Sequence, residues 1–157
     1  MTAADASCPF CRLVAGAASR YVVYRSSTVI ATLAAYRVRP GHVRIIPREH
    51  VTSIAALSPQ AIDGTETAAL TLSPALCKLY GAGRSAWSFA QDGALHIHAN
   101  VLPLVTPSDI VALDALRRAC SQSEERVDQP QLLSSVQLIR QMLTGLIRSA
   151  SSVHLDC

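Results

Sequence analysis

Lysine is almost absent from this chain of 157 residues. Lys78 is the single lysine among 14 basic residues, and the formal net charge is only +3. The arginines that supply the remaining positive charge are scattered, so no continuous basic stripe of the kind that marks nucleic-acid binding is present. We therefore expect no specific nucleic-acid partner, although single arginines can bind phosphates bidentately.

Long apolar runs are also missing. No segment approaches the roughly 20 apolar residues that cross a bilayer, and residues 1–7 have neither the basic start nor the apolar core of a signal peptide. We expect a cytoplasmic protein with no membrane segment. Half of the residues are hydrophobic, which is enough for one well-buried core and favours a single domain.

The cysteines are odd in number, and only two of them are close together. Cys8-Pro-Phe-Cys11 forms a tight pair, whereas Cys77, Cys120 and Cys157 are far apart and are expected to be ordinary thiols. In a reducing compartment, a close pair is more typical of metal or redox chemistry than of a structural disulfide.

Two groups of strands are predicted from β-branched, aromatic and alternating apolar residues. The first group forms a three-stranded antiparallel meander over Tyr21–Tyr24, Thr28–Leu33 and His42–Ile46. The second is a hairpin over Ser85–Ala90 and Ala94–Leu102, with Gln91-Asp-Gly93 as its turn.

A long helix is predicted between these groups. It begins at Pro59 after the N-cap Ser58 and runs to about Tyr80, with a break or kink indicated by Gly64 and Pro74. Gly81 and Gly83 end it.

The C-terminal part of the sequence predicts two further helices, Asp109–Cys120 and Pro130 to about Arg148. A packing face of the second is expected from Leu133, Val136, Ile139, Leu143 and Ile147. The predicted fold is an α+β domain over residues 1–104, with an antiparallel sheet, and residues 105–157 form a helical extension packed on it.

The cysteine pair has two histidines that can complete a metal site. Structural zinc takes four Cys or His ligands, and His50 and His96, each after or within a predicted strand, can join Cys8 and Cys11. Alternatives are a surface-loop role for His50, a buried strand role for His96, and a thioredoxin-type redox pair. The redox alternative is disfavoured because no strand precedes the pair.

The segment His96-Ile-His-Ala-Asn-Val-Leu-Pro103 is the most informative of the chain. In one continuous strand, His96 and His98 would project from the same sheet face about 7 Å apart. One ring could hold a group while the other reacts. His154, near the C-terminus, is expected to be an exposed tail residue.

These motifs resemble those of the histidine triad nucleotide hydrolases and transferases. The resemblance rests on the Cys8-Pro-Phe-Cys11 pair, on Pro40-Gly-His42 followed by Ile45-Ile-Pro-Arg-Glu-His50, and on the strand beginning at His96. It extends from Cys8 to about Leu104 and implies a homodimeric α+β protein.

The resemblance implies that His98 attacks the α-phosphate of a nucleotide or dinucleotide derivative and forms a covalent nucleotidyl-phosphohistidine. Imidazole suits this step because a neutral ring nitrogen can attack near pH 7 if an acceptor holds the other nitrogen in one tautomer. It also implies that His42 supports the strand that presents His98.

By similarity to the zinc-containing galactose-1-phosphate uridylyltransferase branch, the implied ligands of a structural zinc ion are Cys8, Cys11, His50 and His96. Such a zinc ion would lock the N-terminal segment to the strand of His98.

The chain departs from the family pattern at several positions. Asn100 stands where most members have histidine, and its amide can still donate to a phosphate oxygen. The usual Gly-Gln-Ser/Thr segment is missing before His96, although Gln91 can donate to phosphate as its counterpart does in the fragile-histidine branch. Ala34 replaces an acidic or amide acceptor for ribose, and Leu104 replaces a common arginine.

Two functions follow from these observations. The retained His98 favours an enzyme, because a purely structural site has no use for it. The shortened loop and Ala34 favour the alternative, a catalytically degraded, zinc-stabilised domain that binds a nucleotide or a protein.

Overall fold

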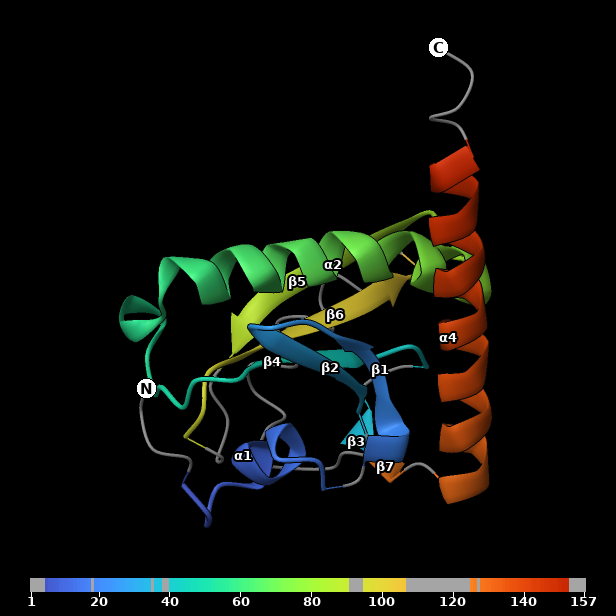
Figure 1. Cartoon of the computed structure of the whole chain (residues 1–157). Helices are drawn as coiled ribbons and strands as arrows, with labels where there is room; N and C mark the ends of the chain where they lie inside the picture. Colours follow the sequence, from blue (N-terminus) through green and yellow to red (C-terminus); the bar gives the residue numbers. More distant parts are fainter. Residues whose placement is uncertain are drawn as a thin grey trace.

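A five-stranded antiparallel sheet forms the centre of the molecule (Figure 1). The computed structural model describes residues 5–17, 19–34, 36–37, 40–90, 95–106, 125–126 and 128–152. The strands of this sheet are β1 (Val22–Arg25), β2 (Val29–Leu33), β4 (Val43–Pro47), β5 (Arg84–Ala90) and β6 (His98–Leu104). Their spatial order is β1-β2-β4-β6-β5.

This topology confirms the predicted α+β class, the N-terminal meander and the antiparallel pairing of the last two strands. The turn predicted at Gln91–Gly93 and the helix predicted at 109–120 lie outside the described residues. A two-stranded sheet that the sequence did not predict pairs β3 (Tyr36–Arg37) with β7 (Glu125–Arg126).

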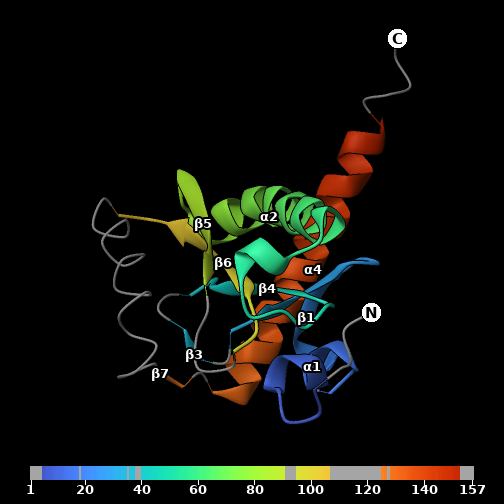
Figure 2. The same ribbon diagram turned by 90° about the vertical axis from the view of Figure 1, so that its left-hand side faces the viewer.

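The two faces of the large sheet are covered by different helices. α2 (Pro59–Tyr80) lies along one face, and α1 (Pro9–Val14) lies against the other (Figures 1 and 2). Alternation along the strands decides which residues meet which helix. Ile45 and Val101 join the core beneath α2, whereas Ile46 packs with Phe10 of α1.

α2 is one continuous helix of 22 residues, so the break expected at Gly64 and Pro74 does not occur. Gly64 serves close packing instead, because a Cβ atom there would collide with the side chain of Thr28. Pro74 lies on the exposed side of the helix, as does Leu70, whose carbonyl has no helical donor from Pro74. The predicted ends are confirmed: the Ser58 hydroxyl accepts from the Ala61 N–H, and Gly81 is left-handed, with φ 65°.

α4 (Gln129–Ser152) confirms the predicted C-terminal helix and extends beyond its expected end. It packs against α2 and β1, and the Arg140 Nε atom donates to the Val22 carbonyl oxygen at 2.9 Å. The buried face is only partly the predicted one, since Ile147 is 59% exposed. The C-terminal end of α4 projects past α2 (Figures 1 and 2). The side chains that it buries are Leu132, Val136, Ile139 and Leu143.

Two short 3₁₀ turns complete the described elements, η1 (Ser19–Tyr21) and η2 (Ile54–Ala56). Among the described residues, no helix is long and apolar enough to cross a membrane.

Candidate functional site

The strand that carries the histidines starts later than the sequence predicted. β6 begins at His98, so His96 lies in the segment before the strand and does not share a pleat with His98. The Ile97 N–H donates to the Val51 carbonyl at 2.8 Å and anchors this segment beside the chain that follows His50. The strand was therefore predicted to begin too early, and the two rings are held by different contacts. Both rings still face α1, because the Phe10 ring packs edge-on against each of them.

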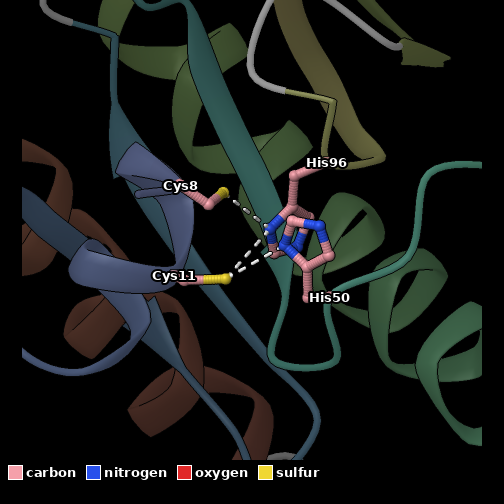
Figure 3. A group of neighbouring side chains, drawn as sticks. All are labelled: Cys8, Cys11, His50 and His96. Atoms are coloured by element: carbon pink, nitrogen blue, oxygen red, sulfur yellow. Dashed lines mark hydrogen bonds between the residues drawn. The ribbon is translucent and has the colours of Figure 1, made fainter. Parts of the chain in front are cut away.

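His96 points toward α1, where it meets the other three predicted metal ligands (Figure 3). One ligand atom from each of Cys8, Cys11, His50 and His96 lies within 4.8 Å of the others. Three of these side chains are buried and His50 is partly buried. A helix turn, a loop and the segment before β6 thus place four metal-ligating side chains around one point.

The spacing of these atoms fits a tetrahedral zinc site. Zn–S and Zn–N bonds of about 2.3 and 2.0 Å give an S···N edge of about 3.5 Å in a tetrahedron. The His96 Nδ1 atom lies 3.5 Å from the Cys8 sulfur and 3.7 Å from that of Cys11, and the His50 Nδ1 atom lies 3.1 Å from the Cys11 sulfur. These residues fit a structural zinc ion held by two thiolates and two imidazoles.

The far side of the His96 ring has the contact that metal-binding histidines usually make. Its Nε2 atom donates to the Pro47 carbonyl oxygen at 3.1 Å, which leaves the lone pair on Nδ1, the atom that faces the sulfurs. Burial lowers the pKa of His96, which favours the neutral form that ligates metal. Burial also raises the pKa of the Cys11 thiol, which a bound metal would oppose.

His98 lies on the α1 face of β6 with its tautomer fixed. The Nδ1 atom donates to the His96 carbonyl oxygen at 3.2 Å. Because a carbonyl oxygen only accepts, Nδ1 carries a proton, and the neutral ring therefore has its lone pair on Nε2. This is the state that a neutral imidazole nucleophile needs.

The ring of His98 is also covered. Only 1% of His98 is exposed, and the Phe10 ring of α1 stands edge-on to it at 4.9 Å between centroids. Phe10 follows the first metal-ligand candidate by two residues and packs at 5.8 Å from the His96 ring as well. The segment that holds the cysteines therefore also covers the candidate nucleophile.

Asn100 and His42 form a buried pair beside His98. The His42 Nε2 atom donates to the Asn100 Oδ1 atom at 2.8 Å, so both N–H bonds of the amide remain for other acceptors. Burial, reinforced by the charge of Arg44, lowers the pKa of His42 to about 4. The ring is neutral near pH 7, in agreement with its Nδ1 atom, which has no hydrogen-bond partner.

The three remaining positions singled out in the sequence are Gln91, Ala34 and Leu104. Gln91 lies outside the described residues. Ala34 is 2% exposed directly after β2, where its N–H donates to the His42 carbonyl. Leu104 ends β6 and is buried.

Sequence reasoning missed two residues that stand beside the candidate site, Phe10 and Arg44. Phe10 could have been found from its position between Cys8 and Cys11, since a residue between two metal ligands lies close to the site. Arg44 could have been found from its position two residues after His42 in an alternating strand, which places it on the same face.

The fold, the histidines of the Cys/His cluster and the buried His42 and His98 together indicate the class of protein. An antiparallel sheet with one long helix across it, an inner strand that presents an imidazole, and a Cys2His2 cluster beside it resemble the features of histidine triad proteins. No family model matches the sequence.

Comparison with known proteins agrees with this class. The chain is 28% identical over 127 residues to an uncharacterised HIT-like protein of Saccharolobus solfataricus, covering 75% of this chain and 88% of that one. It is also similar to the crystal structure of a zinc-bound histidine triad family protein from Mycobacterium smegmatis, with a TM-score of 0.69 and 20% identity over 91% and 97% of the two chains. A third likeness is to the diadenosine triphosphate hydrolase of Plasmodium falciparum, with a TM-score of 0.61 and 11% identity over 80% and 78%. The predicted resemblance to histidine triad proteins is thus confirmed, with a divergent sequence.

Proposed function

We propose that this protein is a nucleotide hydrolase or nucleotidyltransferase that works through a covalent intermediate on His98. The observation that carries the proposal is the bond from His98 Nδ1 to the His96 carbonyl. It places a ring proton on Nδ1, so that the neutral form of the ring has its lone pair on Nε2, and a ring in that form attacks phosphorus without first losing a proton. The similar fold of a diadenosine triphosphate hydrolase supports the choice of a nucleotide as substrate.

The reaction has two displacements. His98 Nε2 forms a bond to the α-phosphorus as the bond from phosphorus to the leaving group breaks, and the leaving group departs with the electron pair and takes a proton. The Asn100 amide donates to a phosphoryl oxygen, since its own oxygen is occupied by His42. Water or another acceptor then attacks phosphorus, releases its proton, and frees the ring.

Zinc has a supporting role in this proposal. We infer that Cys8, Cys11, His50 and His96 would hold it, and that it would supply structure without activating water, because these four ligands would complete a tetrahedral site. His96 supplies both a ligand atom and, through its carbonyl, the acceptor that orients His98. The metal site and the nucleophile are coupled through one residue.

Substrate must displace the side chains that cover His98. With 1% of the residue exposed and the Phe10 ring against it, a phosphate reaches Nε2 only after such a movement. This burial favours the second candidate function, a zinc-stabilised domain that binds a nucleotide or a protein without turnover.

Turnover separates the two candidates. We expect the purified protein to hydrolyse an adenylylated fluorogenic phosphoramidate, a diadenosine polyphosphate or a UDP-sugar, and we expect His98→Ala to abolish that activity. His154→Ala, a histidine substitution near the C-terminus, is the matched control and should retain it. Absence of turnover and of a nucleotidyl adduct with all three substrates would exclude the enzyme and leave the binding module.

Three further inferences accompany this function. The protein is a homodimer, as the family resemblance implies. It acts in the cytoplasm, where a reducing environment keeps Cys8 and Cys11 as thiols. Residues 105–157 are an extension of the domain formed by residues 1–104, supported by the packing of α4 into the core beneath α2.

A further inference from the structure

A row of polar side chains crosses the α1 face of the sheet beside His98. Strand register places Thr32 opposite Arg44, Arg44 opposite Asn100, and Asn100 opposite Ser88. Directly paired residues project to the same face, so the four side chains form one line over β2, β4, β6 and β5. We call this line the polar row.

Solvent reaches part of the polar row, whereas His98 is buried. Arg44 and Ser88 are partly exposed, whereas Thr32 and Asn100 are 5% and 3% exposed. A ligand can therefore reach the row at Arg44, on the central strand β4. Arg44 and His98 are diagonal neighbours across β4 and β6, about 7–8 Å apart at Cβ, which is within the span of a side chain plus a phosphate group.

Among the described strand positions in and beside the polar row, the charged side chain is that of Arg44. The next paired residues on either side of the polar row are not acidic. They are Ile30, Ile46, His98 and Ala90 on one side, and His42, Leu102 and Ala86 on the other. The Arg44 charge is felt within the face, since it adds to burial in lowering the pKa of His42. A guanidinium offers a planar pair of donors that matches a phosphate.

We propose that Arg44 is a specificity-determining residue that binds a second phosphate of the substrate, next to the phosphorus that His98 attacks. This inference rests on the proposed function. It assigns the substrate to phosphate esters with two phosphates, with Asn100 at the attacked group and Arg44 at the other. The second phosphate is either in the same phosphate chain or on another position of the nucleoside.

Binding of three nucleotides tests this assignment and separates the two sources of the second phosphate. The probes are AMP, ADP and adenosine 3′,5′-bisphosphate, titrated calorimetrically into the zinc-loaded protein at one ionic strength. A charge-assisted contact of typical strength corresponds to about 10-fold or more in affinity. We expect ADP or the bisphosphate to bind at least about 10-fold tighter than AMP, and Arg44→Leu to remove that difference.

Arg84→Leu is the matched control, because Arg84 is on the same face but at the edge, opposite Leu104. Arg84→Leu should keep the preference for two phosphates over one. That result would show that the preference does not come from the overall positive charge of the face. Arg44→Gln serves if Arg44→Leu does not fold, with the same expected loss. Equal affinity for all three probes in the wild type, or an unchanged preference in the Arg44 variants, would overturn the inference.

The same variants distinguish this inference from the proposed function. If Arg44→Leu loses the preference while the wild type never forms a His98 adduct, the anion site stands and the enzymatic proposal falls. If the adduct forms and Arg44→Leu keeps the wild-type preference, the enzyme stands and the role of Arg44 is refuted.

Discussion

At the scale of single residues, the site depends on where each imidazole keeps its proton. His96 donates from Nε2 to Pro47, His98 donates from Nδ1 to His96, and His42 donates from Nε2 to Asn100. The sequence predicted which residues gather here, because motif spacing carries residue type and order. It could not predict these proton positions, since each depends on a backbone or amide oxygen that only the folded chain brings near.

His42 provides a test of this arrangement through pH. Its pKa of about 4 in the folded protein is below its ordinary value of 6.5. Between these pH values the unfolded chain therefore binds a proton at His42 and the folded chain does not. Stability is therefore complete above about pH 6.5 and is lost as pH falls toward 4. Between pH 7.5 and 5 we expect this group to cost about 2 kcal/mol.

Urea unfolding of the wild type and of His42→Asn at both pH values measures this cost, since the difference between the two proteins removes contributions that they share. We expect the wild type to lose about 2 kcal/mol more than the variant between pH 7.5 and 5. An equal loss in both proteins would show that His42 does not remain neutral in the folded state.

At the scale of elements, α1 is attached to the sheet by few residues of its own. It has six residues and buries only Phe10 and Cys11, which is too short for a stable isolated helix. The sequence predicted the cysteines as ligands but placed the start of β6 too early. Alternating apolar residues extend through His96, but the backbone there bonds to Val51 instead of to a neighbouring strand.

Metal binding should therefore hold α1 in place. We expect the wild type to purify with one zinc ion per chain, and Cys11→Ser to lose it, with a lower thermal midpoint and faster proteolysis before residue 17. Cys77→Ser is the matched control, because Cys77 lies in α2 outside the cluster and should leave zinc content unchanged. A full complement of zinc in Cys11→Ser, measured by elemental analysis, would contradict this assignment.

At the scale of the whole molecule, the sheet has an edge at β5. Trp87 and Phe89 of this strand are partly exposed, and a seven-residue edge strand is a surface that proteins usually cover. The strands of the meander and of the hairpin followed from the alternation of apolar residues, whereas their union into one five-stranded sheet is seen only in the structure. Contacts between copies leave no pattern of that kind in one sequence.

We expect the protein to be a homodimer in solution. Light scattering coupled to size-exclusion chromatography should give twice the chain mass of 16.7 kDa at micromolar concentration. A mass of one chain at every concentration tested would show that the homodimer inferred from the family resemblance does not form.

The central claim is that His98 becomes covalently bonded to phosphorus, and trapping that intermediate tests it most directly. Zinc-loaded protein is mixed with an adenylylated phosphoramidate, quenched above pH 7 to preserve the P–N bond, and analysed by intact and peptide mass spectrometry. We expect one added nucleotidyl group, located at His98 and missing in His98→Ala. Product formation without an adduct at His98, or an adduct on another residue, would contradict it.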